Sequence, residues 1–367
     1  MILVAGAGGL VGRAAVEVLQ SGRRPWIELS RSARGGAAED GSRSAVSCDV
    51  TDAAALARAA PSVRSIVHLA GVAPGRRPAR ADHEVAAMQA LLALAREREC
   101  DRFVFLSASG ADPSSSHPWL RAKGEAERLL RASGVPFVVL RAGLVASAES
   151  PLLHAVMQLV RAGVPLRLPL LRAGRVLPIA AGDVAIALAT SLDHPRMLGQ
   201  IVDLGVPPAL TLHELLHLVA ARLREPLVLR RLPFRGHAIA AALERVPIAP
   251  LTDGAGFVRL FALLEPPAVD DYDRWIPMRR AAFVDELRGF PWGAPPPRPG
   301  DPLPTAQPPP APALPWIIPG AGRETAAGSA PGGKADSARG ADLSRFGRTD
   351  PYGRVVDGER TPHEDEP

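Results

Sequence analysis

Residues 2–12 read Ile-Leu-Val-Ala-Gly-Ala-Gly-Gly-Leu-Val-Gly, an apolar run followed by a glycine-rich turn. The run predicts a buried strand over Ile2–Ala5, and the apolar spacing after the turn predicts a helix over Leu10–Ser21. Where side chains are absent, a phosphate can reach successive backbone N–H groups beside the positive end of a helix. The stretch therefore predicts a pyrophosphate site whose cofactor-binding residues are Gly6, Gly8, Gly9, Leu10, Val11 and Gly12.

Outward from this stretch, short apolar runs alternate with longer helical patterns, as in βαβ units. Further strands are expected over Trp26–Ser30, Ala45–Ser47, Ser65–Leu69, Arg102–Ser107, Phe137–Arg141 and Gln200–Asp203. Further helices are expected over Ala53–Ala59, Ala81–Glu99, Leu120–Ser133, Leu152–Ala162 and Asp183–Asp193. The predicted fold class is α/β, a Rossmann doubly wound parallel sheet.

The pattern changes twice along the 367 residues. Residues 1–205 are predicted to form the NAD(P)-binding Rossmann domain, and residues 206–294 a small, mostly helical C-terminal lobe. In the lobe we expect one strand near Leu227–Arg231 and helices over Leu212–Leu223, His237–Arg245, Gly254–Leu264 and Arg280–Leu287. Residues 295–367 are rich in Pro and Gly and are expected to be a disordered tail, because such a segment buries too little apolar surface to offset its chain entropy.

Composition excludes several classes of protein. Hydrophobic residues make up 47% of the chain, enough for a sizeable core, but charged residues, Gly and Pro interrupt every apolar stretch well before the length of a membrane span. No basic leader precedes the first strand, so we expect a cytoplasmic protein. The net charge of +5 is spread over helix faces, so no nucleic-acid partner is expected. Cys48 and Cys100 are expected to be free thiols.

The end of the second predicted strand is where an adenosine ribose normally lies. Here it reads Glu28-Leu29-Ser30-Arg31-Ser32-Ala33-Arg34. Ser30, Arg31 and Arg34 suit a 2′-phosphate, whereas an acidic residue would bind the ribose hydroxyls. NADP(H) is therefore the preferred cofactor. Glu28 points to the same side as Ser30 and keeps NAD(H) as the alternative.

Two later strand ends complete the expected cofactor site. Asp49 and Val50 follow the third strand, where a carboxylate can accept from the adenine amino group. The alternative for Asp49 is a cap of the helix beginning near Thr51. Small residues let the chain pass beside the cofactor after the fourth strand, at Leu69, Ala70 and Gly71.

Further motifs follow in order: Phe103–Asp112, Lys123-Gly-Glu-Ala-Glu127, Val135–Gly143 and Gly182–Ala185. Together with the glycine loop they resemble the short-chain dehydrogenase/reductase superfamily, in its atypical branch. The chain is most similar to the NADPH-binding accessory subunit of respiratory complex I and its bacterial relatives, over about residues 1–290. The resemblance implies that Ala142 and Gly143 lie beside the nicotinamide and that Lys123 binds the nicotinamide ribose.

The active members of this superfamily use a Tyr-x-x-x-Lys helix, and this chain has Trp119 four residues before Lys123. An indole N–H donates a hydrogen bond but does not titrate, so it cannot replace the phenol as acid or base. Ala108 stands near the usual hydroxyl position, flanked by Ser107 and Ser109. Lys123 is the sole lysine before residue 334 in an arginine-rich chain, which favours a specific role, because the two cations are not interchangeable. A solvated helix face is the alternative for Lys123.

His213-Glu-Leu-Leu-His217 spells the HExxH pattern of zinc hydrolases. Thr211 and Glu214 form a capping box here, and Leu212, Leu215 and Leu216 supply a core stripe, so we expect an ordinary helix and no metal.

These features predict an NAD(P)H-binding protein in which the usual proton transfer is lost, with a structural, sensory or assembly role. The alternative is an active NADPH-dependent reductase or epimerase that uses Lys123, Ser107 or Ser109, since hydride transfer itself needs no tyrosine. A protein partner, or an anionic membrane surface bound through the Arg-flanked segment Leu159–Val176, stays open as a further partner besides the dinucleotide. In the latter case the protein would lie at the inner face of the membrane.

Overall fold

The fold is that of a computed structural model, which describes residues 1–21, 24–30, 36–37, 43–71, 81–147, 150–161, 166–169, 175–227, 229–232 and 272–276. The chain divides into two compact units, Met1–Leu314 and Pro315–Pro367, and every described residue belongs to the first. Three predicted helices, at residues 237–245, 254–264 and 280–287, lie outside the described residues, as does the expected disordered tail.

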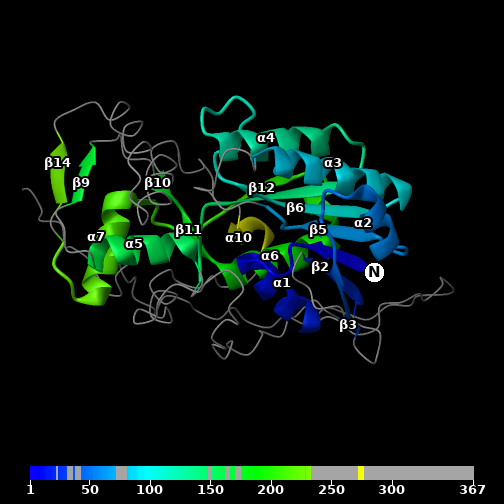
Figure 1. The fold of residues 1–367 in the computed structure, drawn as a ribbon, viewed down its shortest axis with the longest axis horizontal. Coiled ribbons are helices and arrows are strands. Elements are labelled where there is room, and N and C mark those ends of the chain that lie inside the picture. Colours follow the sequence, from blue (N-terminus) through cyan, green and yellow to red (C-terminus); the bar gives the residue numbers. More distant parts are fainter. Residues whose placement is uncertain are drawn as a thin grey trace, which may run out of the picture. The chain divides into compact units, whose positions relative to one another are not determined.

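An eight-stranded sheet forms the centre of the first unit, in the order β12-β7-β6-β5-β1-β2-β4-β3 (Figure 1). All pairings are parallel except the antiparallel pairing of the short edge strand β3 with β4. The strands are β1 (Ile2–Ala5), β2 (Trp26–Ser30), β3 (Gly36–Ala37), β4 (Arg43–Ser47), β5 (Ser65–His68), β6 (Arg102–Ala108), β7 (Phe137–Ala142) and β12 (Ile201–Leu204). The predicted α/β fold is confirmed.

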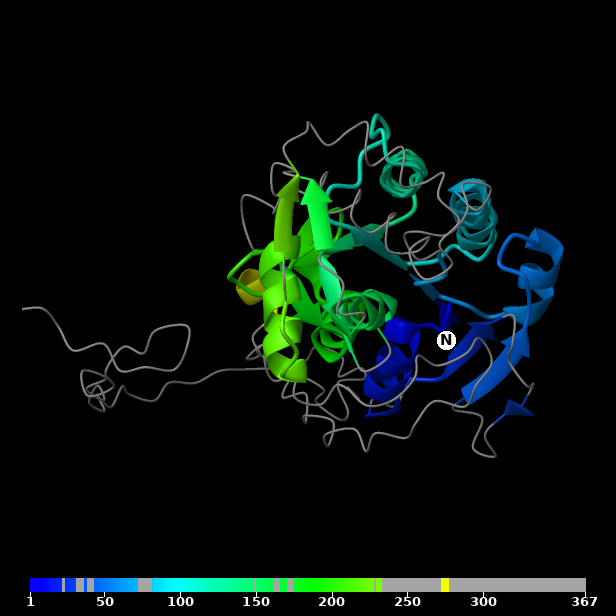
Figure 2. The ribbon, with the colours of Figure 1, turned by 60° about the vertical axis from the view of Figure 1, so that its left-hand side comes forward.

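Helices cover both faces of this sheet, with α3 and α4 on one side and α1 and α6 on the other (Figures 1 and 2). The central strands β1 and β5 are buried along their whole length, which explains why β1 reads as a continuous apolar run. One apolar core joins the sheet to α1 and α6, and a second joins it to α2, α3 and α4. The helices are α1 (Leu10–Ser21), α2 (Ala53–Ala59), α3 (Ala81–Glu97), α4 (Pro118–Arg131) and α6 (Ala181–Asp193), followed by a 3₁₀ turn at Pro195–Met197.

The direction of strand order reverses between β1 and β5. From β1 the chain proceeds outward through β2 and β4, then returns to β5 and proceeds the other way through β6, β7 and β12. In open α/β sheets, ligands bind outside the carboxyl ends of the strands at such a reversal. The residues that follow β1 and β5 therefore define where a site is expected.

Beyond the sheet, the described residues include three small strand pairs and two further helices. β8 (Leu144–Ala146) pairs with β11 (Pro178–Ala180), β10 (Arg175–Val176) with β13 (Leu210–Thr211), and β9 (Leu166–Pro169) with β14 (Leu229–Leu232). Helices α5 (Pro151–Arg161) and α7 (Leu212–Leu223) contribute to an apolar cluster that also includes Leu120 of α4 and Leu144 of β8. The last described element is α10 (Tyr272–Trp275).

The structure confirms most of the predicted elements and adds short ones. The expected bounds of β1, β2, α1, α2 and α7 agree residue for residue. Helix α4 begins two residues earlier than expected, at Pro118, a residue suited to the first turn of a helix. The strand pairs of the previous paragraph, apart from β14, were not predicted, because runs of two to four residues carry too little periodicity. Cys48 and Cys100 are free and buried, as expected.

Candidate dinucleotide site

The glycine loop after β1 lies directly against the end of β5. Gly6 has a φ of +92°, and a Cβ atom there would lie 2.5 Å from the backbone nitrogen of Ala70. A Cβ atom at Gly12 would lie 2.1 Å from the carbonyl oxygen of Gly6. Both distances exclude a side chain, so close backbone packing at the sheet reversal requires glycine at these two positions.

The same turn presents backbone donors at the start of α1. The first helical hydrogen bond runs from the Arg13 N–H to the Gly9 carbonyl, at 3.0 Å, so the N–H groups of Leu10, Val11 and Gly12 precede it. Such groups have no acceptor within their own helix and suit an anion. Gly8 is exposed, and a Cβ atom there would meet only the Ser30 side chain, at 3.5 Å for its oxygen. The cradle fits a diphosphate.

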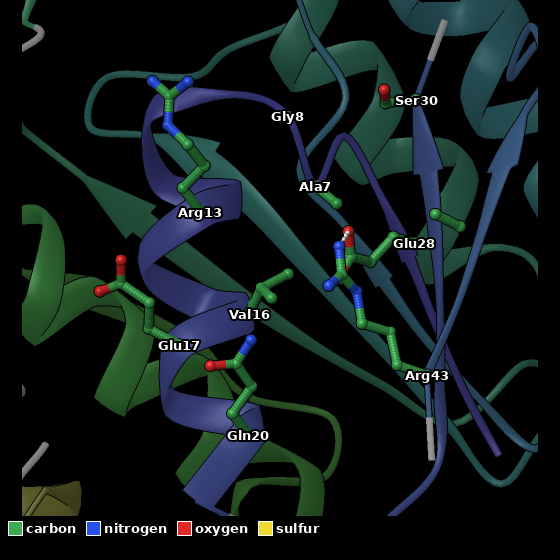
Figure 3. A pocket seen from close by; sticks show the side chains of 10 residues that line it. Ala7, Gly8, Arg13, Val16, Glu17, Gln20, Glu28, Ser30 and Arg43 are labelled. Carbon is green, nitrogen blue, oxygen red and sulfur yellow. Dashed lines mark hydrogen bonds and ion pairs between the residues drawn. The ribbon is translucent and has the colours of Figure 1, made fainter. Parts of the chain in front are cut away.

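A pocket of about 450 Å³ adjoins Gly8 between α1 and the strands β2 and β4 (Figure 3). Arg13, Glu17 and Gln20 line it from the helix, and Glu28, Ser30 and Arg43 from the strands. Ser30 thus lies where the adenosine ribose was expected. Arg31 and Arg34 lie outside the described residues.

Within this pocket the Glu28 carboxylate is already engaged. Arg43 Nε lies 2.6 Å from Glu28 Oε1, and the Trp26 indole N–H donates to the same oxygen at 3.2 Å. The pair is partly open, since the Arg43 side chain is 46% exposed and that of Glu28 13%. The carboxylate is therefore neutralised by a cation that solvent can reach.

Sequence reasoning did not identify Arg13 or Arg43. Arg13 follows directly after Gly12, a position that could have been noticed because the first turn of α1 borders the phosphate cradle. Arg43 pairs with Trp26 in the parallel register of β2 and β4, and no local pattern gives that register. Burial lowers the pKa of Arg13, although Glu17 raises it.

Asp49 makes a turn with its neighbours. Its Oδ1 accepts from the N–H of Thr51 at 2.9 Å and from the Thr51 hydroxyl at 2.8 Å, and it lies 3.6 Å from His83 Nε2. The helix cap is Asp52, which accepts from the N–H of Ala55. Asp49 is exposed, while Val50 is buried in the core under the sheet.

A buried ion pair lies behind the end of β5. Lys123 Nζ of α4 is 2.7 Å from Glu84 Oε1 of α3 and donates to the Leu106 carbonyl at 3.0 Å. The side chains of Lys123 and Glu84 are 8% and 2% exposed, so the interpretation of Lys123 as part of a solvated face is wrong. A Cβ atom at Gly71 would lie 2.8 Å from Glu84 Oε2 and 3.3 Å from Lys123 Nζ. Lys123 therefore lies next to the strand end that contacts the glycine loop.

His68, the last residue of β5, is a neutral imidazole at this place. It is fully buried and stacks on Phe105 with ring centroids 5.2 Å apart. Burial, followed by the nearby Lys123 and His83, lowers the pKa of His68 to about 3. Neither ring nitrogen has a hydrogen-bond partner among the described residues.

The hydroxyl groups at the end of β6 have different surroundings. Ser107 donates to Glu127 Oε1 at 2.5 Å, and Arg141 holds the same carboxylate from β7 with Nε at 2.9 Å and a second nitrogen at 2.6 Å. The bond to Glu127 raises the pKa of Arg141. Ser109 is buried, and its hydroxyl has no partner in the part of the chain that the structure describes.

The remaining predicted residues lie around the same strand ends. Trp119 is half-buried and packs against the apolar cluster of α5 and α7. Ala142 is buried at the end of β7, and a Cβ atom at Gly143 would lie 2.2 Å from the Leu177 carbonyl oxygen. The structure thus brings the glycine loop, residues 69–71, Lys123 and the ends of β6 and β7 to one edge of the sheet.

The HExxH pattern lies on the exposed side of α7. Thr211 accepts from the N–H of Glu214, and the Glu214 side chain accepts from the N–H of Thr211, which confirms the capping box. His213 and His217 are both exposed, with ring centroids 4.6 Å apart. No group of three or more potential metal ligands occurs among the described residues.

Sequence comparison identifies a family for more than half of the chain. The model of a family described as NAD(P)H-binding matches residues 6–195. This range spans the glycine loop, the pocket and Lys123. No curated protein sequence matches the chain.

Structure comparison finds solved enzymes with the same fold. A nucleoside-diphosphate-sugar epimerase from Staphylococcus aureus superposes with a TM-score of 0.61 at 17% identity, covering 78% of this chain and 99% of the other. The Bordetella bronchiseptica enzyme WbmG, solved with NAD and UDP, has a TM-score of 0.58 at 16% identity, with coverages of 78% and 91%. UDP-glucose 4-epimerase from Bifidobacterium longum, solved with NAD⁺ and UDP, has a TM-score of 0.57 at 14% identity, with coverages of 78% and 95%. At these identities the likeness extends to the fold.

Two findings concern the membrane. No helix within the described ranges is both long and apolar enough to span a bilayer. Half of the segment Leu159–Val176, considered above as a membrane contact, lies outside the described residues.

Proposed function

Because the chain belongs to this NAD(P)H-binding family, we propose that it holds a nicotinamide dinucleotide across the carboxyl ends of β1 and β5 without running the usual proton-transfer chemistry. The observation that carries the proposal is the bare backbone of the glycine loop. At Gly6 and Gly12 there is no room for a side chain, and at Gly8 the backbone is open to a ligand. The diphosphate would bind there, on the N-terminus of α1.

We propose NADP(H) as the preferred cofactor. Support comes from the pocket beside Gly8, which is lined by Arg13, Arg43 and Ser30 as well as by two glutamates, and in which Arg43 already neutralises Glu28. Guanidinium groups and a hydroxyl suit a 2′-phosphate, and both oxygens of the Glu28 carboxylate already have partners in Arg43 and Trp26. NAD(H) is the alternative cofactor.

The proposed role is structural, sensory or in assembly, as in the accessory subunit of complex I that the sequence resembles. Trp119 supports this role, because it stands at the tyrosine position and cannot exchange a proton. The Ser107 hydroxyl also donates to Glu127, which Arg141 holds in turn, so this hydroxyl is committed to a structural network. The proposal includes a further partner besides the dinucleotide, either a protein or an anionic membrane surface.

The second candidate is an active reductase or epimerase. One observation favours it: the hydroxyl of Ser109 is buried at the end of β6 and lacks a partner among the described residues, so it could face a substrate. Following NADPH absorbance across a panel of carbonyl, quinone and nucleotide-sugar substrates separates the two candidates. Turnover that disappears in Ser109→Ala would support the enzyme over the binding protein.

The test of the proposed function is calorimetric titration of the full chain with NADPH and NADH. We expect micromolar or tighter binding of at least one, with NADPH the tighter. Failure of both dinucleotides to bind would overturn the proposal. Identifying the nucleotide that copurifies with the protein checks the same result independently.

A further inference from the structure

The Lys123–Glu84 pair has hydrogen-bonding capacity that its partners do not fill. An ammonium group has three donors, and Lys123 uses one on Glu84 Oε1 at 2.7 Å and one on the Leu106 carbonyl at 3.0 Å. Its Nζ also lies over the Phe105 ring, 4.8 Å from the centroid, and no third hydrogen-bond acceptor occurs among the described residues. Glu84 Oε2 is buried and likewise has no partner among those residues. An unpaired buried carboxylate oxygen is costly, so it marks a place where a hydrogen-bond donor is expected.

The backbone passes close to the pair at a glycine. A Cβ atom at Gly71 would lie 2.8 Å from Glu84 Oε2 and 3.3 Å from Lys123 Nζ, and Gly71 itself is exposed. Its neighbour Ala70 is the residue against which Gly6 of the glycine loop packs. The unused donor and acceptor therefore lie beside Gly71, and the residue before it, Ala70, contacts the glycine loop that would hold the diphosphate.

The chemistry of the pair selects the kind of group that fits. A phosphate or a carboxylate would bring a second anion against Glu84, and a metal ion would meet the ammonium of Lys123. A vicinal diol offers one hydroxyl that donates to a carboxylate and another that accepts from an ammonium. A ribose attached to the diphosphate presents such a diol.

We propose that Glu84 is a dinucleotide-binding residue, accepting a hydrogen bond from one hydroxyl of the nicotinamide ribose while Lys123 donates to the other. The inference rests on the proposed function and adds to it a cofactor-binding residue on α3. It also gives Glu84 a second task, because its charge balances the buried ammonium of Lys123. The ion pair thus serves as a neutral receptor for a diol.

Comparing two ligands that differ by this ribose measures its contribution to binding affinity. ADP ends at the diphosphate and ADP-ribose adds the second ribose, so the ratio of their Kd values reports the diol. The same pair with a 2′-phosphate on the adenosine serves if the protein prefers NADP(H). In the wild type we expect ADP-ribose to bind about tenfold or more tightly than ADP, as two hydrogen bonds to charged groups allow.

The test variant replaces both charges together, as Glu84→Gln with Lys123→Met, because either change alone leaves a buried unpaired charge. We expect it to bind ADP within about twofold of the wild type and to lose most of the tenfold gain for ADP-ribose. The control is Glu125→Gln with Arg128→Met, which removes an exposed pair on the same helix, joined at 2.6 Å. This control should keep the wild-type ratio.

A second variant keeps the inference testable if the first does not fold. Gly71→Ala places a methyl group in the space in front of the pair and should also reduce the ratio while leaving ADP binding unchanged. A wild-type ratio in either folded variant would overturn the assignment of Glu84. If the wild type binds ADP, ADP-ribose and NADPH equally poorly, the proposed function fails, which is a different result.

Discussion

A glutamate–cation ion pair lies at each end of the candidate site, and the two pairs differ in their exposure to solvent. At the end proposed for adenosine, Glu28 and Arg43 lie in an open pocket, with side chains 13% and 46% exposed. At the end proposed for nicotinamide, the side chains of Glu84 and Lys123 are 2% and 8% exposed. Water can replace either partner of the first pair, whereas the second pair is shielded from water, and Lys123 is held there by Glu84 and the Leu106 carbonyl. The first pair can therefore exchange partners when a ligand binds, and the second is a fixed part of the fold.

The largest effect is expected from breaking the buried pair. Lys123→Met leaves the Glu84 carboxylate buried without a cation and should lower the free energy of unfolding by about 3–5 kcal/mol. Urea denaturation measures the change. Adding Glu84→Gln to this variant should restore most of the loss, because no buried charge then remains. A single variant as stable as the wild type would contradict the interpretation of the pair as fixed.

The neutral imidazole of His68 next to this pair gives a dependence on pH. The pKa of His68 is about 3 in the fold and near 6.5 in the unfolded chain, so the unfolded state binds the proton more readily. Above pH 6.5, His68 is neutral in both states and its protonation does not lower the free energy of unfolding. As the pH falls from 6.5 toward 3, the free energy of unfolding falls by up to about 1.4 kcal/mol per pH unit.

The measurement compares urea denaturation at several pH values for the wild type and His68→Phe, a ring that can still stack on Phe105. The variant should lose less stability than the wild type between pH 6.5 and 4. Replacing the exposed His217 by Asn serves as the control and should keep the wild-type slope. Parallel pH profiles for wild type and His68→Phe would show that His68 does not titrate as the structure indicates.

At the open end, a change should alter ligand preference more than stability. Arg13→Ala removes a guanidinium from the pocket that we propose for the 2′-phosphate, and should weaken NADPH binding about tenfold while changing NADH binding by less than about twofold. Calorimetric titration of both dinucleotides gives the ratio. Arg58→Ala, at an exposed arginine of α2, is the control. An equal loss for NADPH and NADH would place the 2′-phosphate elsewhere.

The smallest effect is expected from the exposed counterpart of the buried pair. Glu28→Gln should change the free energy of unfolding by about 1 kcal/mol or less, because solvent can hydrate the released Arg43. Urea denaturation under the conditions used for Lys123→Met allows direct comparison. A loss as large as that of the buried pair would remove the distinction between the two ends.

The sequence predicted the parts of the fold and the site whose signals are local. Apolar runs, glycines and a capping box fixed β1, α1 and α7 to the residue, and the glycine loop lies at the reversal of strand order. Lys123 was singled out because it is a rare lysine in an arginine-rich chain. The signals for β1, α1 and α7 lie within a few neighbouring residues, and the signal for Lys123 comes from the composition of the whole chain.

The partners of these residues could not be predicted in the same way. Glu84 lies 39 positions before Lys123, and Glu127 lies 20 positions after Ser107. Their contacts depend on how α3 and α4 pack on the sheet and on each other, and nothing in the periodicity of either helix specifies that packing. Arg43 meets Glu28 through the register of two parallel strands, which the sequence between them does not reveal. Residues joined by tertiary packing required the structure.

The central claim is that the open backbone at Gly8 receives the diphosphate of a dinucleotide. The most direct measurement is calorimetric titration of NADPH, or of NADH if it binds more tightly, into the wild type, Gly8→Ala and Gly182→Ala. A Cβ atom at Gly182 meets nothing within 4 Å, and one at Gly8 makes only ordinary contact with Ser30, so both variants should fold. We predict that Gly182→Ala binds like the wild type and that Gly8→Ala binds at least about tenfold more weakly, because the methyl group keeps the phosphate from the backbone. Wild-type affinity in Gly8→Ala would contradict the account.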